Sequence, residues 1–92
     1  MNTIWIPTPL RAYTNGEKEI RVVGETVGTA LRELATCYPD LARHLFDEDM
    51  TLRPYVNVFL NDDDVRSLLG EATPVGAGDR LLIVPSIAGG RT

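Results

Sequence analysis

The residues best suited to take part in chemistry lie at the end of the chain, Ser86-Ile87-Ala88-Gly89-Gly90-Arg91-Thr92. Consecutive glycines have no Cβ atoms, so Gly89 and Gly90 present only backbone and reach backbone angles closed to other residues. Such a segment fits a narrow channel, where another protein's active site can grip a backbone carbonyl at the end of a tether. The alternative interpretation is an ordinary frayed terminus, since chain ends are commonly disordered whatever their sequence.

Three aspartates and a short glycine-rich stretch could bind ions, but their sequence context favours plain turns. Asp62, Asp63 and Asp64 lack the glycine and the distal glutamate that a calcium-binding loop places at fixed spacing. Gly76-Ala77-Gly78 resembles part of a phosphate-binding loop, yet a predicted strand follows it where such a loop would open a helix. We therefore predict solvated turns at both places, and no bound metal or cofactor.

The thiol, imidazole and large aromatic side chains do not form a recognisable catalytic set. Cys37 lies off the apolar stripe of its predicted helix, and no Lys, Arg or His adjoins it to activate the thiol. His44 has no sequence-adjacent nucleophile and is typical of a surface turn. Trp5 and Phe59 are better explained by packing, in the core or on a sheet face, than by base stacking. The chain is therefore predicted not to be an enzyme itself.

Size and composition indicate one globular domain. Of the 92 residues, 43% are hydrophobic and 24% charged, as in ordinary globular proteins. The net charge of -4 and the lack of a Lys/Arg cluster argue against nucleic acid, since phosphate binding needs many cationic contacts. No apolar run approaches the roughly 20 residues of a membrane helix, no signal-peptide pattern is present, and the single Cys37 fits a reducing compartment. We therefore expect a cytoplasmic protein without membrane or nucleic-acid partners.

The first part of the chain predicts two antiparallel strands joined by a long loop. Thr3-Ile4-Trp5-Ile6 alternates apolar faces and is followed by Pro7 and Pro9, which cannot donate to a strand ladder. Asn15-Gly16 is the dipeptide that most readily supplies positive φ at a reversal. Residues 18–22 then alternate polar and apolar side chains, as a second strand would.

A helical spacing of apolar residues begins after Thr26, which is the predicted N-cap. The residues at positions i, i+3, i+4, i+7 and i+11 of one helix face are Val27, Ala30, Leu31, Leu34 and Tyr38. Pro39 ends the helix, because its ring disfavours helical geometry at the residue before it. Asp40 is then predicted to cap a short turn in which Leu41 and Leu45 face inward.

The second half predicts strands with the most buried one last. Residues 55–60 alternate apolar side chains, and Asn61-Asp62-Asp63 supplies the turn after them. Residues 65–69 fit either one helical turn or a short strand. After a turn at 76–79, residues 80–84 form a nearly unbroken apolar run, which belongs in the middle of a sheet.

This order of elements predicts an α+β protein with the β-grasp architecture, a mixed sheet of four to five strands with one main helix across one face. The sheet and helix would occupy residues 1–86. The flexible Gly-Gly tail would occupy residues 87–92 and leave directly from a central strand.

Two segments then make the chain resemble the ubiquitin-like sulfur-carrier proteins. Residues 56–66 carry the pattern Val-Asn-x-x-x-Asn-Asp-x-Asp-Val-Arg, and residues 78–90 carry a Gly-Asp turn, an apolar strand, a proline and Gly-Gly in that order. This family includes the small subunit of molybdopterin synthase and the carriers for thiamine and cysteine biosynthesis. The chain is most similar to the cysteine-biosynthesis carrier, through the first pattern and Ile6-Pro7-Thr8.

The resemblance implies a role in sulfur transfer. A ubiquitin-activating-type adenylyltransferase would use ATP and magnesium to adenylate the Gly90 carboxylate, and a sulfur donor would displace AMP to leave a thiocarboxylate. Gly89, Ala88 and Ile87 would form the part of the tail that passes into the partner's channel, and Phe59 would belong to the docking face. A sulfur-accepting synthase, similar to cysteine synthase or another enzyme, would then receive the sulfur.

One departure from the family pattern is that Arg91-Thr92 follows Gly90, where members usually end at the second glycine. The Gly90 carbonyl is then held in an amide and cannot be adenylated. The resemblance therefore implies a precursor that a metalloprotease trims between Gly90 and Arg91. A remnant of cloning is the alternative origin of the last two residues.

Three other functions fit the same sequence. The chain could be a ubiquitin-like modifier that is joined to lysines of target proteins through Gly90. It could donate sulfur in the molybdopterin or thiamine pathway. It could also be a β-grasp interaction module whose tail is inert.

Overall fold

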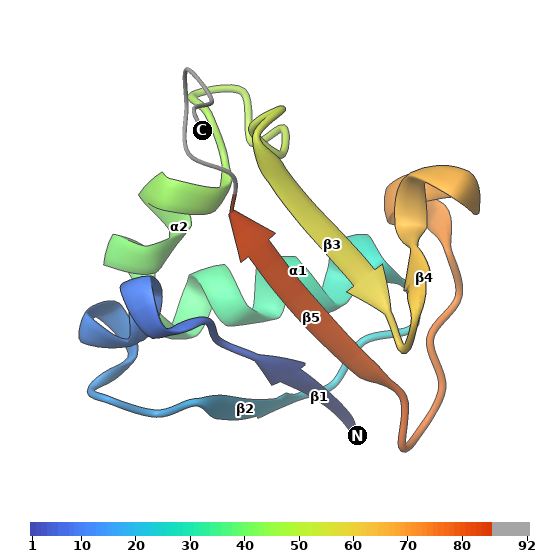
Figure 1. The fold of residues 1–92 in the computed structure, drawn as a ribbon, viewed down its shortest axis with the longest axis horizontal. Coiled ribbons are helices and arrows are strands. Elements are labelled where there is room, and N and C mark those ends of the chain that lie inside the picture. Colours follow the sequence, from blue (N-terminus) through green and yellow to red (C-terminus); the bar gives the residue numbers. More distant parts are fainter. Residues whose placement is uncertain (86–92) are drawn as a thin grey trace.

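The fold is known from a computed structural model, in which residues 1–85 are described. Two α-helices and five strands make up the framework (Figure 1). In chain order they are β1 Asn2–Trp5, β2 Glu19–Val22, α1 Val27–Cys37, α2 Pro39–Leu45, β3 Val56–Leu60, β4 Asp63–Asp64 and β5 Arg80–Pro85. Short 3-10 helices cover Thr8–Thr14, Val65–Ser67 and Gly70–Ala72.

The five strands form one mixed sheet in the order β2-β1-β5-β3-β4. β5 lies in the middle, parallel to β1 and antiparallel to β3, while β1 and β2 pair antiparallel. Both helices lie on the same side of the sheet, with α1 crossing behind β5 in Figure 1. This is the β-grasp arrangement, and the predicted central position of the last strand is confirmed.

The core lies between the helices and one face of the sheet. Thr26 caps α1 as predicted: its hydroxyl accepts from the Thr29 amide, and the Thr29 hydroxyl accepts from the Thr26 amide. The apolar stripe of α1 is buried, although Tyr38 at its end is only half-buried. The side chains with no exposed surface include Ile4, Leu31, Leu34, Leu41, Leu45, Leu81 and Ile83.

The connections after Pro39 and before Asn15 differ from the prediction. The short turn after Pro39 is a seven-residue helix, α2, and Asp40 does not cap it. Pro39 occupies the first helical position, where its missing N–H costs nothing, so Tyr38 is the N-cap. The Tyr38 side chain makes no capping hydrogen bond. The long loop before Asn15 contains the 3-10 helix Thr8–Thr14, which the sequence analysis did not predict; Asn15 and Gly16 do take positive φ after it.

Two turns fix the start of β5 against its neighbours. Asn61 adopts a left-handed backbone (φ 56°) directly after β3. Its amide donates to the Arg80 carbonyl (2.8 Å), and its side-chain Oδ1 accepts from the Arg80 amide (3.2 Å). The second turn immediately precedes β5. There Gly78 has φ 86°, and Asp79 Oδ2 accepts from the Gly76 amide at 2.7 Å. Asn61 and the Gly-Asp turn therefore set the strand from which the tail departs.

Replacing Asn61 separates its two contributions. Asn61→Gly keeps the left-handed backbone available but removes the side-chain acceptor, and we expect it to lower the free energy of unfolding by about 1 kcal/mol. Asn61→Ala also forces an alanine into the left-handed conformation, so we expect it to lower the free energy of unfolding, measured in urea, by about 2 kcal/mol. Equal losses in the two variants would show that the backbone conformation is not the constraint.

Candidate functional site

The described part of the chain ends on the central strand of the sheet. β5 pairs along both edges, and its Leu81 and Ile83 side chains are fully buried beneath it. Its last residue, Pro85, lies opposite Val56 of β3. The predicted tail and processing residues lie outside the described part of the chain and stay predictions: Ile87, Ala88, Gly89, Gly90 and Arg91.

The sheet face opposite the helices carries a row of apolar side chains. Trp5 of β1 pairs with Leu82 of β5, and Leu82 pairs with Phe59 of β3. Their neighbours along each strand point into the core, so these three side chains share the outer face. All three are half-buried. The structure therefore places the predicted docking residue, Phe59, within an apolar row across the three central strands, here called the outer row.

The apolar surface continues toward the end of β5. Val84 is on the same face as Leu82, two residues further along the strand, and 38% of its surface is exposed. Asn57 of β3 lies opposite it. An apolar surface thus runs from the outer row to within one residue of the strand end.

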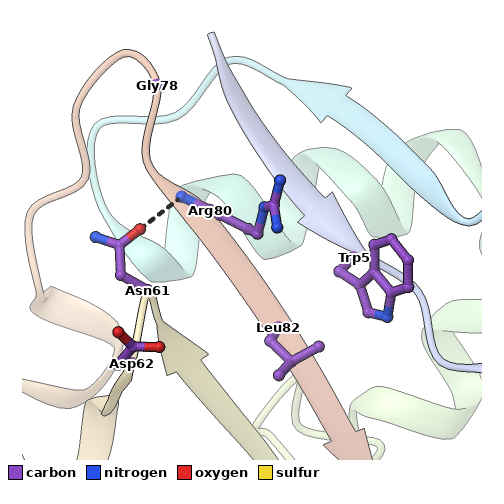
Figure 2. Close-up of a pocket in the computed structure, with 6 residues that line it drawn as sticks. All are labelled: Trp5, Asn61, Asp62, Gly78, Arg80 and Leu82. Atoms are coloured by element: carbon purple, nitrogen blue, oxygen red, sulfur yellow. Dashed lines mark hydrogen bonds between the residues drawn. The ribbon is translucent and has the colours of Figure 1, made fainter.

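Polar groups border the outer row, and they come from segments far apart in the sequence. The Arg11 guanidinium lies over the Trp5 ring, 5.5 Å from its centroid, and Arg11 Nε donates to the Ile6 carbonyl at 3.0 Å. A shallow pocket beside Trp5 and Leu82 is lined also by Asn61, Asp62, Gly78 and Arg80 (Figure 2). Because this hollow is open and combines apolar side chains with the polar Asn61, Asp62 and Arg80, it is suited to receive a polar or charged side chain of a docking protein.

Arg66 has a structural role that sequence reasoning did not identify. Its guanidinium donates to Asn57 Oδ1 (2.7 Å) and to the carbonyls of Pro54 (2.9 Å) and Val56 (3.0 Å). It thereby satisfies backbone acceptors at the start of β3, the strand that pairs with the end of β5. This contact could have been predicted from Asn57 and Arg66 of the 56–66 pattern, since they lie nine residues apart on segments that a turn brings together.

The other candidates for chemistry lie apart from one another. Cys37 is exposed, and the exposed His44 stacks on Tyr13 with 4.3 Å between ring centroids. Among residues 1–85, no three His, Cys, Asp or Glu side chains gather as metal ligands would. Asp64 Oδ1 accepts from the Arg66 amide. Asp62 is exposed at the turn, whereas Asp63 and Asp64 form strand β4, so the predicted turn is shorter than expected. Within that same range, no helix is both long and apolar enough to cross a membrane.

Comparison with known proteins agrees with this architecture over nearly the whole chain. The sequence is 38% identical over 90 residues to the sulfur carrier protein CysO of Mycobacterium tuberculosis, covering 96% of this chain and 97% of that protein. It is 43% identical over 65 residues to small archaeal modifier protein 3 of Haloferax volcanii, covering 71% and 70%. A chain in the crystal structure of the Amycolatopsis orientalis BexX/CysO complex superposes with a TM-score of 0.87 at 37% identity, covering 98% of this chain and all of that one.

The family comparison reaches further along the sequence than the described structure. The sequence model of the ThiS family matches residues 4–90, which run from β1 through both glycines of the tail. The match includes the strands of the outer row and the turns that set β5. The chain therefore belongs to the ThiS family, the ubiquitin-like sulfur carriers.

Proposed function

We propose that the protein carries sulfur as a thiocarboxylate on Gly90 and delivers it in a biosynthetic pathway. The observation that carries this proposal is the family match from residue 4 to residue 90, because it includes the Gly-Gly pair as well as the folded domain. The similarity to a protein named sulfur carrier CysO supports it across 96% of the chain. A central strand that ends at Pro85, next to an open apolar face, fits a carrier whose reacting group is handled by other proteins.

The chemistry requires three steps at the carboxyl group of Gly90. A protease first hydrolyses the peptide bond between Gly90 and Arg91, which leaves a free carboxylate. That carboxylate attacks the α-phosphate of ATP on an adenylyltransferase and releases pyrophosphate, with Mg²⁺ held by the enzyme and the nucleotide. A hydrosulfide ion then attacks the carbonyl carbon and displaces AMP, so that the carbon keeps one oxygen and gains one sulfur. The carrier itself supplies no catalytic side chain and binds no cofactor.

The tail residues are assigned different parts in this scheme. Gly90 carries the reacting group, Gly89 gives clearance, and Ala88 and Ile87 supply the last side-chain contacts at the channel mouth. The five residues after Pro85 that end at Gly90 can extend by at most about 17 Å. Holding them in one conformation costs roughly 1 to 2 kcal/mol each. Docking elsewhere on the domain must offset that cost.

The outer row is the proposed docking surface for the activating enzyme. Trp5, Leu82 and Phe59 are rigid apolar side chains on a sheet, and apolar anchors of this kind dominate the energy of protein interfaces. Val84 extends the surface toward the tail. An enzyme that covers this face would hold the start of the tail in a fixed position relative to its active site.

We further propose the pathway and the remaining partners. Similarity to CysO favours cysteine biosynthesis, with a cysteine-synthase-like enzyme as sulfur acceptor and a metalloprotease as the trimming enzyme. The steps would take place in the cytoplasm. The domain would comprise residues 1–86, with residues 87–92 as the tail.

The first test is chemical and uses three forms of the chain. The form ending at Gly90 should support ATP–pyrophosphate exchange by the host's adenylyltransferase, whereas the form retaining Arg91-Thr92 and a form ending at Gly89 should not. The Gly89-ended form is the matched control, because it keeps a free carboxylate on a glycine. Mass spectrometry of the protein isolated from its host should find a chain ending at Gly90 with one oxygen replaced by sulfur. Exchange with the untrimmed chain, or an intact end in every preparation, would contradict the proposal.

The second test concerns the docking surface. Phe59→Asp and Val84→Asp place a charge within the apolar surface, so we expect each to weaken binding to the activating enzyme by about 10-fold or more. Leu69→Asp is the matched control, because Leu69 is 67% exposed and lies outside the sheet face. Thermal unfolding checks that the variants stay folded. Binding unchanged in both face variants, or weakened equally by the control, would exclude this surface.

The ubiquitin-like modifier remains a second candidate, favoured by the similarity to small archaeal modifier protein 3 over 65 residues. In that case Gly90 would form isopeptide bonds with lysines of target proteins. A denaturing blot of host extract should then show conjugates of higher mass that disappear when Gly90 is deleted. If deletion of Gly89 and Gly90 changes neither sulfur transfer nor conjugation, the tail is inert and both functions are wrong.

A further inference from the structure

The arginines of this protein fall into two groups by what their guanidinium groups contact. In the described part of the chain, four of them are engaged with the protein: Arg11, Arg32, Arg53 and Arg66. Three have no side-chain partner within residues 1–85, namely Arg21, Arg43 and Arg80. The unpartnered guanidinium groups are therefore the ones available for contacts with another molecule.

Two of these three share one row of the outer sheet face. Arg21 of β2 pairs with Thr3 of β1, and Thr3 pairs with Arg80 of β5. The two arginines thus flank one strand, with their backbones about 10 Å apart. Thr3 and Arg80 precede Trp5 and Leu82 by two residues, or about 7 Å, on the same strands. The two arginines therefore lie directly beside the outer row. Figure 2 shows the Arg80 side chain extending from β5 toward β1.

No carboxylate near this row forms an ion pair with either arginine. Arg32–Glu71 is the one ion pair within 4.0 Å among residues 1–85, so neither Arg21 nor Arg80 is paired with Glu19 or Asp62, the exposed acidic residues on this side. Asp79 lies close in sequence, but its carboxylate accepts from the Gly76 amide and from Asn61 Nδ2. An exposed pair of guanidinium groups thus stands on a chain whose net charge is -4.

We propose that Arg21 and Arg80 select the activating enzyme by binding carboxylates that border its apolar docking surface. Arginine forms geometrically specific, two-pronged hydrogen bonds with carboxylates, and the two arginines lie on either side of Thr3 in the sheet. The adjacent apolar row favours a protein over a polyanion such as nucleic acid, which would need more than two cations. This inference rests on the proposed function, because the partner is the enzyme that adenylates Gly90.

The test compares two charge reversals in the chain ending at Gly90. Arg80→Glu should raise the KM for the carrier in ATP–pyrophosphate exchange by about 10-fold or more and leave kcat unchanged, because the contact positions the carrier without touching the reacting atoms. Arg43→Glu is the matched control, since Arg43 is an unpartnered exposed arginine on α2 and the net charge changes by the same amount. Arg21→Glu should act like Arg80→Glu, and Arg80→Lys should restore part of the affinity.

Ionic strength gives an independent readout. Between about 0.05 and 0.5 M salt, the wild-type KM should rise steeply and that of the Arg21→Glu/Arg80→Glu double variant should change little. An unchanged KM for Arg80→Glu, or an equal rise for Arg43→Glu, would overturn the inference while leaving the proposed function intact. On a single-stranded oligonucleotide column, the wild type and the double variant should elute alike. Retention of the wild type that the double variant loses would favour nucleic acid as the partner and overturn the inference. No exchange with the wild-type Gly90-ended chain would overturn the proposed function and this inference together.

Discussion

The structure depends above all on the pairing of β5 between β1 and β3. The first and last strands of the described chain meet in parallel at the centre of the sheet, and β3 closes the other edge. The buried side chains of β5, Leu81 and Ile83, face the helices, while Leu82 and Val84 face away from them. One strand therefore joins the core to the outer row and also leads to the tail. A substitution that weakens the pairing of β5 would therefore affect the core, the outer row and the strand end that precedes the tail.

The polar side chains of the domain have mainly structural roles. Within residues 1–85 the polar side chains mainly complete turns and strand edges, as Asn61, Asp79 and Arg66 do. They are not gathered into a catalytic centre. If the protein acts as proposed, enzymes recognise it by its surface, and the exposed sheet face has more influence on function than the interior.

Much of the fold, but little of the outer row, could be predicted from the sequence. The Thr26 cap and the apolar stripe of α1 were predictable because both are local patterns, and the burial of β5 followed from its unbroken apolar run. The 3-10 helix Thr8–Thr14 and the helix after Pro39 were not predicted, because packing decides short elements more than local preference does. The outer row could be predicted only through Phe59, since Trp5 and Leu82 join it through a long-range strand pairing.

The parallel pairing of β1 with β5 also fixes how the two ends of the domain can be used. Thr3 lies beside Arg80 at the start of β5, and the Gly78 amide donates to the Met1 carbonyl, whereas Pro85 lies at the far end of that strand, about 17 Å away. A fluorescent label, affinity tag or fused domain attached ahead of Met1 would project from the end of the sheet opposite to Pro85. An attachment there would leave the Pro85 end of β5, with the exposed Val84 beside it, unobstructed.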